Sequence, residues 1–164
     1  MKIALTLSAT ILILTGALIW GMVNRTSAYI DDRCFANFTY TDNTNEKAFN
    51  FKGNIFFEFS KNKTGQFNLS GDVSYQGQNY TFSRYVKFNY VNIKNNAYRI
   101  KIISHETMAH DNVPAAISPL AIKILFLTGE YSMYLHKHDN NFITIGNSLS
   151  PLMNCVIQSL SLIH

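Results

Sequence analysis

The chain has 164 residues and a formal net charge of +4, and 13% of its residues are aromatic. This length allows one domain with its own hydrophobic core plus a short accessory segment. The content of only 8 Gly and 3 Pro argues against a disordered chain, and the scattered Lys and Arg residues argue against nucleic-acid binding.

The first element in chain order is an apolar segment near the N-terminus. Ile3–Val23 carries no formal charge, and at about 1.5 Å per residue it can cross a hydrocarbon core of about 30 Å. Secretory signals usually have a shorter apolar core. We therefore expect a retained anchor over residues 1–25. A cleaved signal is the alternative, because Thr26-Ser27-Ala28 resembles a cleavage site. Residues 26–164 would form an exported, β-rich domain.

The two cysteines, Cys34 and Cys155, lie far apart in the sequence. Cysteines that bind metal or carry redox chemistry are more often closely spaced, whereas distant cysteines in an exported domain are typical of disulfides. We expect one disulfide that joins the last strand to the first. Two buried free thiols are the alternative.

The pattern after Asp31 has a period of two residues, which indicates β-strands. Five strands joined by short turns are expected first, and two or three more near the C-terminus. They are predicted near Cys34 to Tyr40 and over residues 54–60, 66–75, 78–91, 98–103, 130–138, 141–146 and 154–162.

Three features within these strands predict local geometry. Gln76-Gly77 predicts a tight hairpin turn. Gly71 indicates a bulge or a bend, and the alternation slips near Arg84-Tyr85, which indicates another bulge.

The strand pattern breaks at Ser104, and we expect an irregular, solvated loop over residues 105–118. Ser118 is a suitable N-cap, Pro119 suits the first helical position and Gly129 suits the stop, which together predict a short helix over residues 119–128. This helix is apolar almost all round and should be buried. The whole pattern predicts a mainly β domain, either a curved antiparallel meander or an incomplete barrel, with one short helix.

No constellation of residues indicates an enzyme. His105 and His110 have the spacing HExxxH, whereas zinc-protease helices need HExxH to place both histidines on one face. His136 and His138 share a strand face without an evident third ligand. No nucleophile motif or phosphate loop is recognisable. We expect no catalytic, metal or cofactor site. A metal-dependent hydrolase built from these histidines is the enzymatic alternative.

The aromatic residues are expected to fill the core. If the sheet encloses a cavity, they would instead line a pocket for an apolar ligand or a surface for a partner. The candidates are Phe56, Phe67, Phe82, Phe88, Tyr90 and, on the helix, Leu125. An open sheet must also protect its edge strands, and a partner chain that supplies a strand would do so.

Several short motifs are spread over nearly the whole chain. They are Cys34-Phe35-Ala36-Asn37-Phe38, Asn54-Ile55-Phe56-Phe57 with Gly65, Leu69-Ser70-Gly71, Ser83-Arg84-Tyr85-Val86, Asp111-Asn112-Val113-Pro114, and the pair Pro151 and Cys155. This set resembles the FidL-like family of small enterobacterial membrane proteins. The resemblance transfers no catalytic motif.

The resemblance implies a partnership with a ToxR-like regulator, which has a cytoplasmic winged-helix DNA-binding domain, one membrane span and a periplasmic domain. It also implies a lipocalin-like barrel, and a bile-salt-like apolar molecule as a candidate ligand. The expected protein is a single-pass inner-membrane protein with a cytoplasmic N-terminus and a periplasmic domain that stabilises or tunes the regulator, without direct contact to nucleic acid. The alternative is a self-sufficient, tethered periplasmic binder of an apolar ligand.

Overall fold

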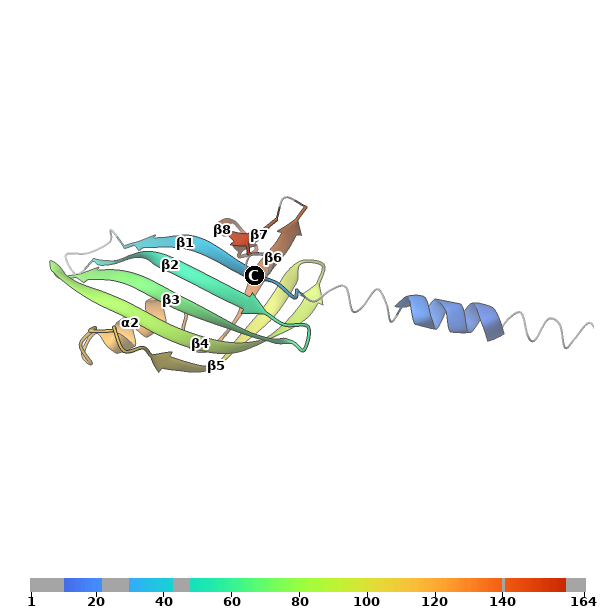
Figure 1. Ribbon diagram of the computed structural model, residues 1–164, viewed down its shortest axis with the longest axis horizontal. Coiled ribbons are helices and arrows are strands. Elements are labelled where there is room, and N and C mark those ends of the chain that lie inside the picture. The colour runs from blue at the N-terminus through green and yellow to red at the C-terminus, as the bar shows by residue number, and fades with distance from the viewer. Residues whose placement is uncertain (1–10, 22–29, 43–47, 140, 159–164) are drawn as a thin grey trace, which may run out of the picture.

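The computed structural model describes residues 11–21, 30–42, 48–139 and 141–158. Within them, eight antiparallel strands close into a barrel in chain order (Figure 1). The strands are β1 (Arg33–Thr41), β2 (Phe49–Phe59), β3 (Thr64–Tyr75), β4 (Gln78–Lys94), β5 (Ala97–Thr107), β6 (Glu130–His138), β7 (Phe142–Gly146) and β8 (Pro151–Ile157). The prediction of a mainly β chain is confirmed. The expectation of an incomplete barrel is wrong, because β8 returns to pair with β1.

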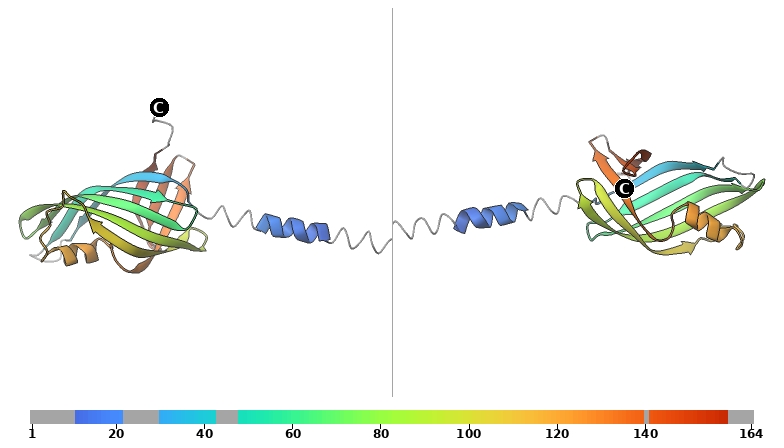
Figure 2. Two further views of the ribbon diagram at one scale, coloured as in Figure 1. Left: turned by 60° about the horizontal axis from the view of Figure 1, so that its bottom comes forward. Right: turned by 180° about the vertical axis from the view of Figure 1, so that it is seen from behind.

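The barrel has two unequal parts. Strands β1 to β5 form one continuous curved wall, and strands β6 to β8, of which β7 and β8 are the shortest in the barrel, stand at the end where β1 begins (Figures 1 and 2). The helix α2 (Ser118–Ile124) lies at the opposite end, between β5 and β6 in the sequence. One end of the barrel therefore carries strands β6 to β8, and the other end carries α2 (Figure 1).

The predicted hairpin turn between β3 and β4 is confirmed. Gln76 and Gly77 both have positive φ, at 52° and 75°. Two consecutive residues with positive φ form the turn whose twist matches that of the flanking strands. The glycine tolerates this conformation because it has no Cβ.

The bulge expected at Gly71 is wrong. β2 and β3 pair without a register shift, and Gly71 lies opposite Gly53. A Cβ on Gly71 would collide with the Lys52 carbonyl oxygen and with the Cα of Gly53. Gly71 therefore allows the backbones of β2 and β3 to approach closely and does not mark a bulge.

The bulge expected near Arg84-Tyr85 is also misplaced. The register of β4 with β5 shifts between Lys87 and Phe88 and again near Lys94, but β4 alternates regularly around Arg84. The apparent slip in the sequence arises because Arg84, a charged residue, occupies an inward position between Phe82 and Val86. Its side chain is buried.

The segment after Ser104 is more regular than expected. β5 continues to Thr107, which pairs with Arg84 of β4. The helix is shorter than the predicted 119–128 and begins at Ser118, while Ile117 takes the N-cap position without a side-chain hydrogen bond. The last strand begins at Pro151 rather than at residue 154, and the end predicted for it lies outside the described residues.

The core is the interior of the barrel, filled from all eight strands and from α2. Aromatic rings from β2, β3 and β4 pack against one another, with centroids of Phe59 and Tyr90 5.7 Å apart and those of Phe57 and Phe67 5.2 Å apart. Ala121, Leu125 and Leu127 bring the helical segment into this core.

The predicted membrane anchor lies only partly within the described residues. Residues 11–21 form a helix with exposed side chains. No helix in the described part of the chain has the length and apolar character needed to cross a membrane. The remainder of the predicted span, like the cleavage site at Thr26-Ser27-Ala28, lies outside the described residues.

Candidate partner-binding edge

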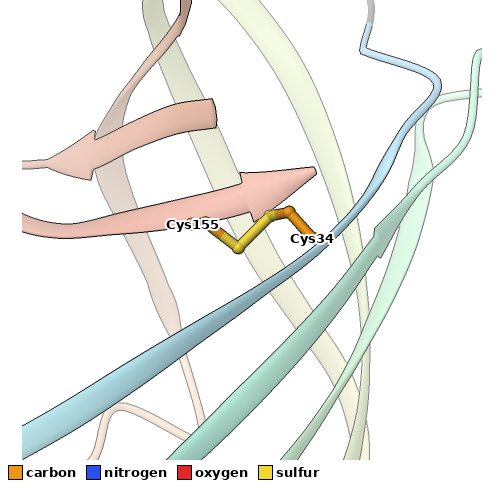
Figure 3. Close-up of a disulfide and its surroundings, with 2 residues drawn as sticks. All are labelled: Cys34 and Cys155. Carbon is orange, nitrogen blue, oxygen red and sulfur yellow. A yellow bond between two sulfur atoms is a disulfide. The ribbon is translucent and has the colours of Figure 1, made fainter. Parts of the chain in front are cut away.

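A disulfide joins β1 to β8, as the sequence predicts. Cys34 and Cys155 are bonded across a separation of 121 residues (Figure 3). Both side chains are fully buried. The bridge therefore fastens the last strand of the barrel to the first, and the alternative of two free thiols is wrong.

The backbone pairing at this junction is short. Cys34 pairs with Ile157 and Phe35 with Val156, and the Gln158 N–H donates to the Arg33 carbonyl at 2.8 Å. β1 and β2, by contrast, pair along the whole of β1. The junction of β1 and β8 thus closes the barrel at one end only.

Beyond this junction, the side of β1 that faces away from β2 carries no strand in the described part of the chain. Asp32 accepts a hydrogen bond from Phe59 and Asp42 donates one to Phe49, so even-numbered residues direct their backbone groups toward β2. Odd-numbered residues direct theirs to the other side. We call the backbone of Ala36–Thr41 on that side the free edge of β1; its outward-directed groups belong to Asn37, Thr39 and Thr41.

Two aromatic side chains lie beside the free edge. Phe38 and Tyr40 point into the barrel but are only partly buried. Phe38 contacts the ring of Phe51 at a centroid distance of 5.8 Å, and Tyr40 contacts that of Phe49 at 6.4 Å. An added strand would cover the surface that these two rings still expose.

One row of side chains on the outer face of the barrel, at the junction of β1 and β8, is mostly apolar. Directly opposite residues of antiparallel strands share a face, and the register aligns five side chains across β6, β7, β8, β1 and β2. We call them the apolar wall: His138, Phe142, Val156, Phe35 and Phe56. Val156 is 54% exposed and Phe35 37%. The imidazole of His138 stacks on the ring of Phe142 with centroids 4.3 Å apart.

The outer face of β3 and β4 is polar by comparison. Ser70 and Ser83 share a hydrogen bond of 3.1 Å, and the Tyr85 hydroxyl donates to Gln66. Contiguous exposed apolar side chains on a soluble domain are characteristic of interaction surfaces. The apolar wall and the free edge of β1 are therefore the strongest candidates for partner binding.

The structure divides the predicted apolar residues between two locations. Phe67, Phe82, Phe88, Tyr90 and Leu125 are buried in the core. Phe56 faces outward on β2, and its neighbour Phe57 takes the inward position instead. The Tyr90 hydroxyl lies 2.7 and 2.8 Å from the carbonyl oxygens of Ile30 and Ser60, which share its one donor hydrogen. These residues therefore pack the core, and Phe56 alone of the six belongs to an outer surface.

The four histidines within the described residues do not assemble into a metal site. His105 lies in β5 and His110 in the turn that follows it. His136 and His138 lie side by side on the outer face of β6, with ring centroids 4.3 Å apart. In the described residues, no group of three or more His, Cys, Asp or Glu side chains has an arrangement that could hold a metal ion.

Sequence reasoning missed one buried ion pair. Arg84 on β4 contacts Asp111 of the loop that precedes α2, and both side chains are at most 3% exposed. Arg84 also donates to the Ser118 hydroxyl at 3.2 Å, and the carboxylate of Asp111 accepts from the Ser83 N–H at 2.7 Å. The loop expected to be solvated is therefore fixed to the barrel. The sequence did contain a signal for this ion pair, because an arginine at an inward position of an alternating strand requires a buried partner of opposite charge.

A comparison with protein families identifies the family of this chain. The model of the family described as "FidL-like putative membrane protein" matches residues 71–155, just over half of the chain. The chain belongs to the FidL-like family. In this FidL-like chain the matched region runs from within β3 to Cys155 on β8, and it contains both Arg84 and Asp111. No curated protein matches the chain.

Proposed function

We propose that this FidL-like chain is a membrane-anchored periplasmic accessory protein that binds the periplasmic domain of a ToxR-like single-span regulator and stabilises or tunes it. The observation that carries the proposal is the free edge of β1 beside the apolar wall. The partner would add an extended strand to this edge.

The free edge supplies both affinity and register for such a strand. The N–H and C=O groups of Asn37, Thr39 and Thr41 point to the side where the strand would lie. Strand addition satisfies these backbone groups, and pockets for alternate side chains give specificity. Apolar side chains at every second position of the partner would cover Phe38 and Tyr40.

The disulfide supports an exported location. Disulfides form and persist in oxidising compartments such as the bacterial periplasm. The uncharged sequence of Ile3–Val23 supports an anchor, as does the family's description as a membrane protein. A single-span regulator presents its periplasmic domain at the same membrane, so the two domains would meet there.

The alternative of a tethered binder for an apolar ligand has less support. It requires the inward apolar side chains to line a cavity, but five of the six candidates, four aromatic residues and one leucine, are packed in the core. The proposal includes no catalytic step and no cofactor.

Co-purification tests the proposal. The full chain and a ToxR-like regulator from the same organism are co-expressed, extracted in an uncharged detergent and recovered through a tag on the regulator. The informative variant is Thr39→Pro, which removes one outward-directed N–H and leaves the ladder with β2 intact, as an edge strand tolerates. Thr39→Ala, which keeps the N–H, is the matched control.

We expect the wild type and Thr39→Ala to co-purify with the regulator, and Thr39→Pro to be lost although its melting temperature stays close to that of Thr39→Ala. Failure of the wild type to co-purify, together with an unchanged level and output of the regulator in cells that lack this chain, would show that the proposed function is wrong.

A further inference from the structure

A pocket of about 470 Å³ opens at the end of the barrel where the chain enters β1. It lies between residues that precede β1, the turn after β2 and the paired ends of β5 and β6. Its volume falls within the range of small-ligand sites, about 300–1,000 Å³.

The floor of the pocket is apolar and the walls are charged. Ile30, Tyr98 and Leu135 form the floor, and all three are buried. Two ion pairs flank it: Lys61 lies 3.1 Å from Asp31, and Lys137 lies 2.7 Å from Asp32.

The two ion pairs differ in burial. Asp32 is only 16% exposed, while Lys137 and both members of the other pair are more than half exposed. Ion pairs at such exposed positions contribute little to stability, about 0–1 kcal/mol. A ligand that offers the same charges can therefore replace their partners at small cost.

We propose that this pocket binds the zwitterionic ammonium–phosphate group of an amphiphile. The ammonium would lie against Asp31 and Asp32, the phosphate against Lys61 and Lys137, and the adjoining apolar part over Tyr98 and Leu135. A ligand with a net negative charge would meet the two carboxylates, and one with a net positive charge would meet the two ammonium groups. The two carboxylates and two ammonium groups of the lining, beside the imidazole of His136, therefore favour a ligand without net charge.

Two sources share this chemistry: a zwitterionic lipid of the bilayer and a soluble zwitterionic solute. The lipid source rests on the proposed membrane anchor. The charge preference rests on the pocket alone and needs no regulator, so its failure would leave the proposed partnership unaffected.

Calorimetric titration of the full chain in an uncharged detergent tests the proposal. The probes are dihexanoyl-phosphatidylethanolamine, which is zwitterionic, dihexanoyl-phosphatidylglycerol, which is anionic with the same acyl chains, and free phosphoethanolamine. Asp32→Asn removes one proposed contact. Glu106→Gln is the matched control, because Glu106 forms an exposed ion pair with Lys87 away from the pocket.

We expect the zwitterionic lipid to bind at least about tenfold more tightly than the anionic one, and Asp32→Asn to weaken it by about tenfold, as the loss of a hydrogen bond to a charged group does. Glu106→Gln should bind as the wild type does. Preferential binding of the lipid over free phosphoethanolamine would identify the bilayer as the source, and equal binding would identify a soluble solute. Equal affinity for both lipids, or an Asp32→Asn variant that binds as the wild type does while it remains folded, would overturn the proposal.

Discussion

Removal of the disulfide should cost this domain a large share of its stability. The double variant Cys34→Ala, Cys155→Ala deletes the bridge without burying a new hydroxyl, which serine would do at a site with no exposure. The bridge joins residues 121 positions apart. In the loop-entropy model a closed loop of this length stabilises the folded state by about 5 kcal/mol.

This loss of about 5 kcal/mol is large compared with the total free energy of unfolding. Domains of this size unfold with free energies of about 5–15 kcal/mol. The junction that the bridge supports is also short, since only two residues of β1 pair with residues of β8. In the variant without the disulfide, we expect the pairing of β8 with β1 to break before the rest of the barrel unfolds.

Urea denaturation of the full chain in an uncharged detergent, followed by tyrosine fluorescence and near-UV circular dichroism, measures the effect. With a slope of about 2 kcal/mol per molar urea, the midpoint of the double variant should fall by about 2.5 M. Each single variant should show a similar loss, because either one abolishes the bridge. A midpoint that falls by less than about 0.5 M would refute the view that the disulfide holds the barrel closed.

Three further outcomes follow from the structure. Arg84→Met or Asp111→Asn should each lower the free energy of unfolding by about 3–5 kcal/mol, since one buried charge is left unpaired. The double variant should lose less free energy of unfolding than the two single variants do together. A double variant whose loss in urea melts equals the sum of the two single losses would contradict the pairing. Gly71→Ala should cost about 1–3 kcal/mol by overpacking against β2, and Gly77→Asn, at a turn position with open space, should cost little in the same thermal melt. Burial raises the pKa of Tyr131 to about 12 from an ordinary value of 10.0. The contribution of Tyr131 to stability is therefore complete below pH 10 and is lost as the pH rises toward 12. In an absorbance titration at alkaline pH, Tyr131→Phe should show one tyrosine fewer ionising near pH 12 than the wild type, and an unchanged number would contradict the assignment.

Local sequence patterns were sufficient to predict most of the strands. Alternation of apolar residues depends on near neighbours, so it identified the long strands and the turn at Gln76-Gly77. The wide spacing of Cys34 and Cys155, together with the expectation that the chain is exported, indicated the bridge that the structure contains. These features are local or depend on residue type alone.

Features that depend on distant contacts could not be predicted in the same way. The inward position of Arg84 is stable because Asp111, which lies in a loop beyond β5, supplies the opposite charge. Closure of the barrel depends on pairing of Phe35 with Val156, and no periodicity reveals such a pairing. The free edge of β1 follows from the same pairing, because it exists only where β8 stops accompanying β1.

The free edge of β1 is the central element of the proposed function, and site-specific photo-crosslinking in cells tests it most directly. A photoreactive residue is placed at position 37 or 39 on the edge, and at position 68 or 83 on the polar outer face of β3 and β4 as a control. We expect crosslinks to the periplasmic domain of the ToxR-like regulator from positions 37 and 39 alone. Equal crosslinking from all four positions, or crosslinks from the control positions only, would contradict strand addition at this edge.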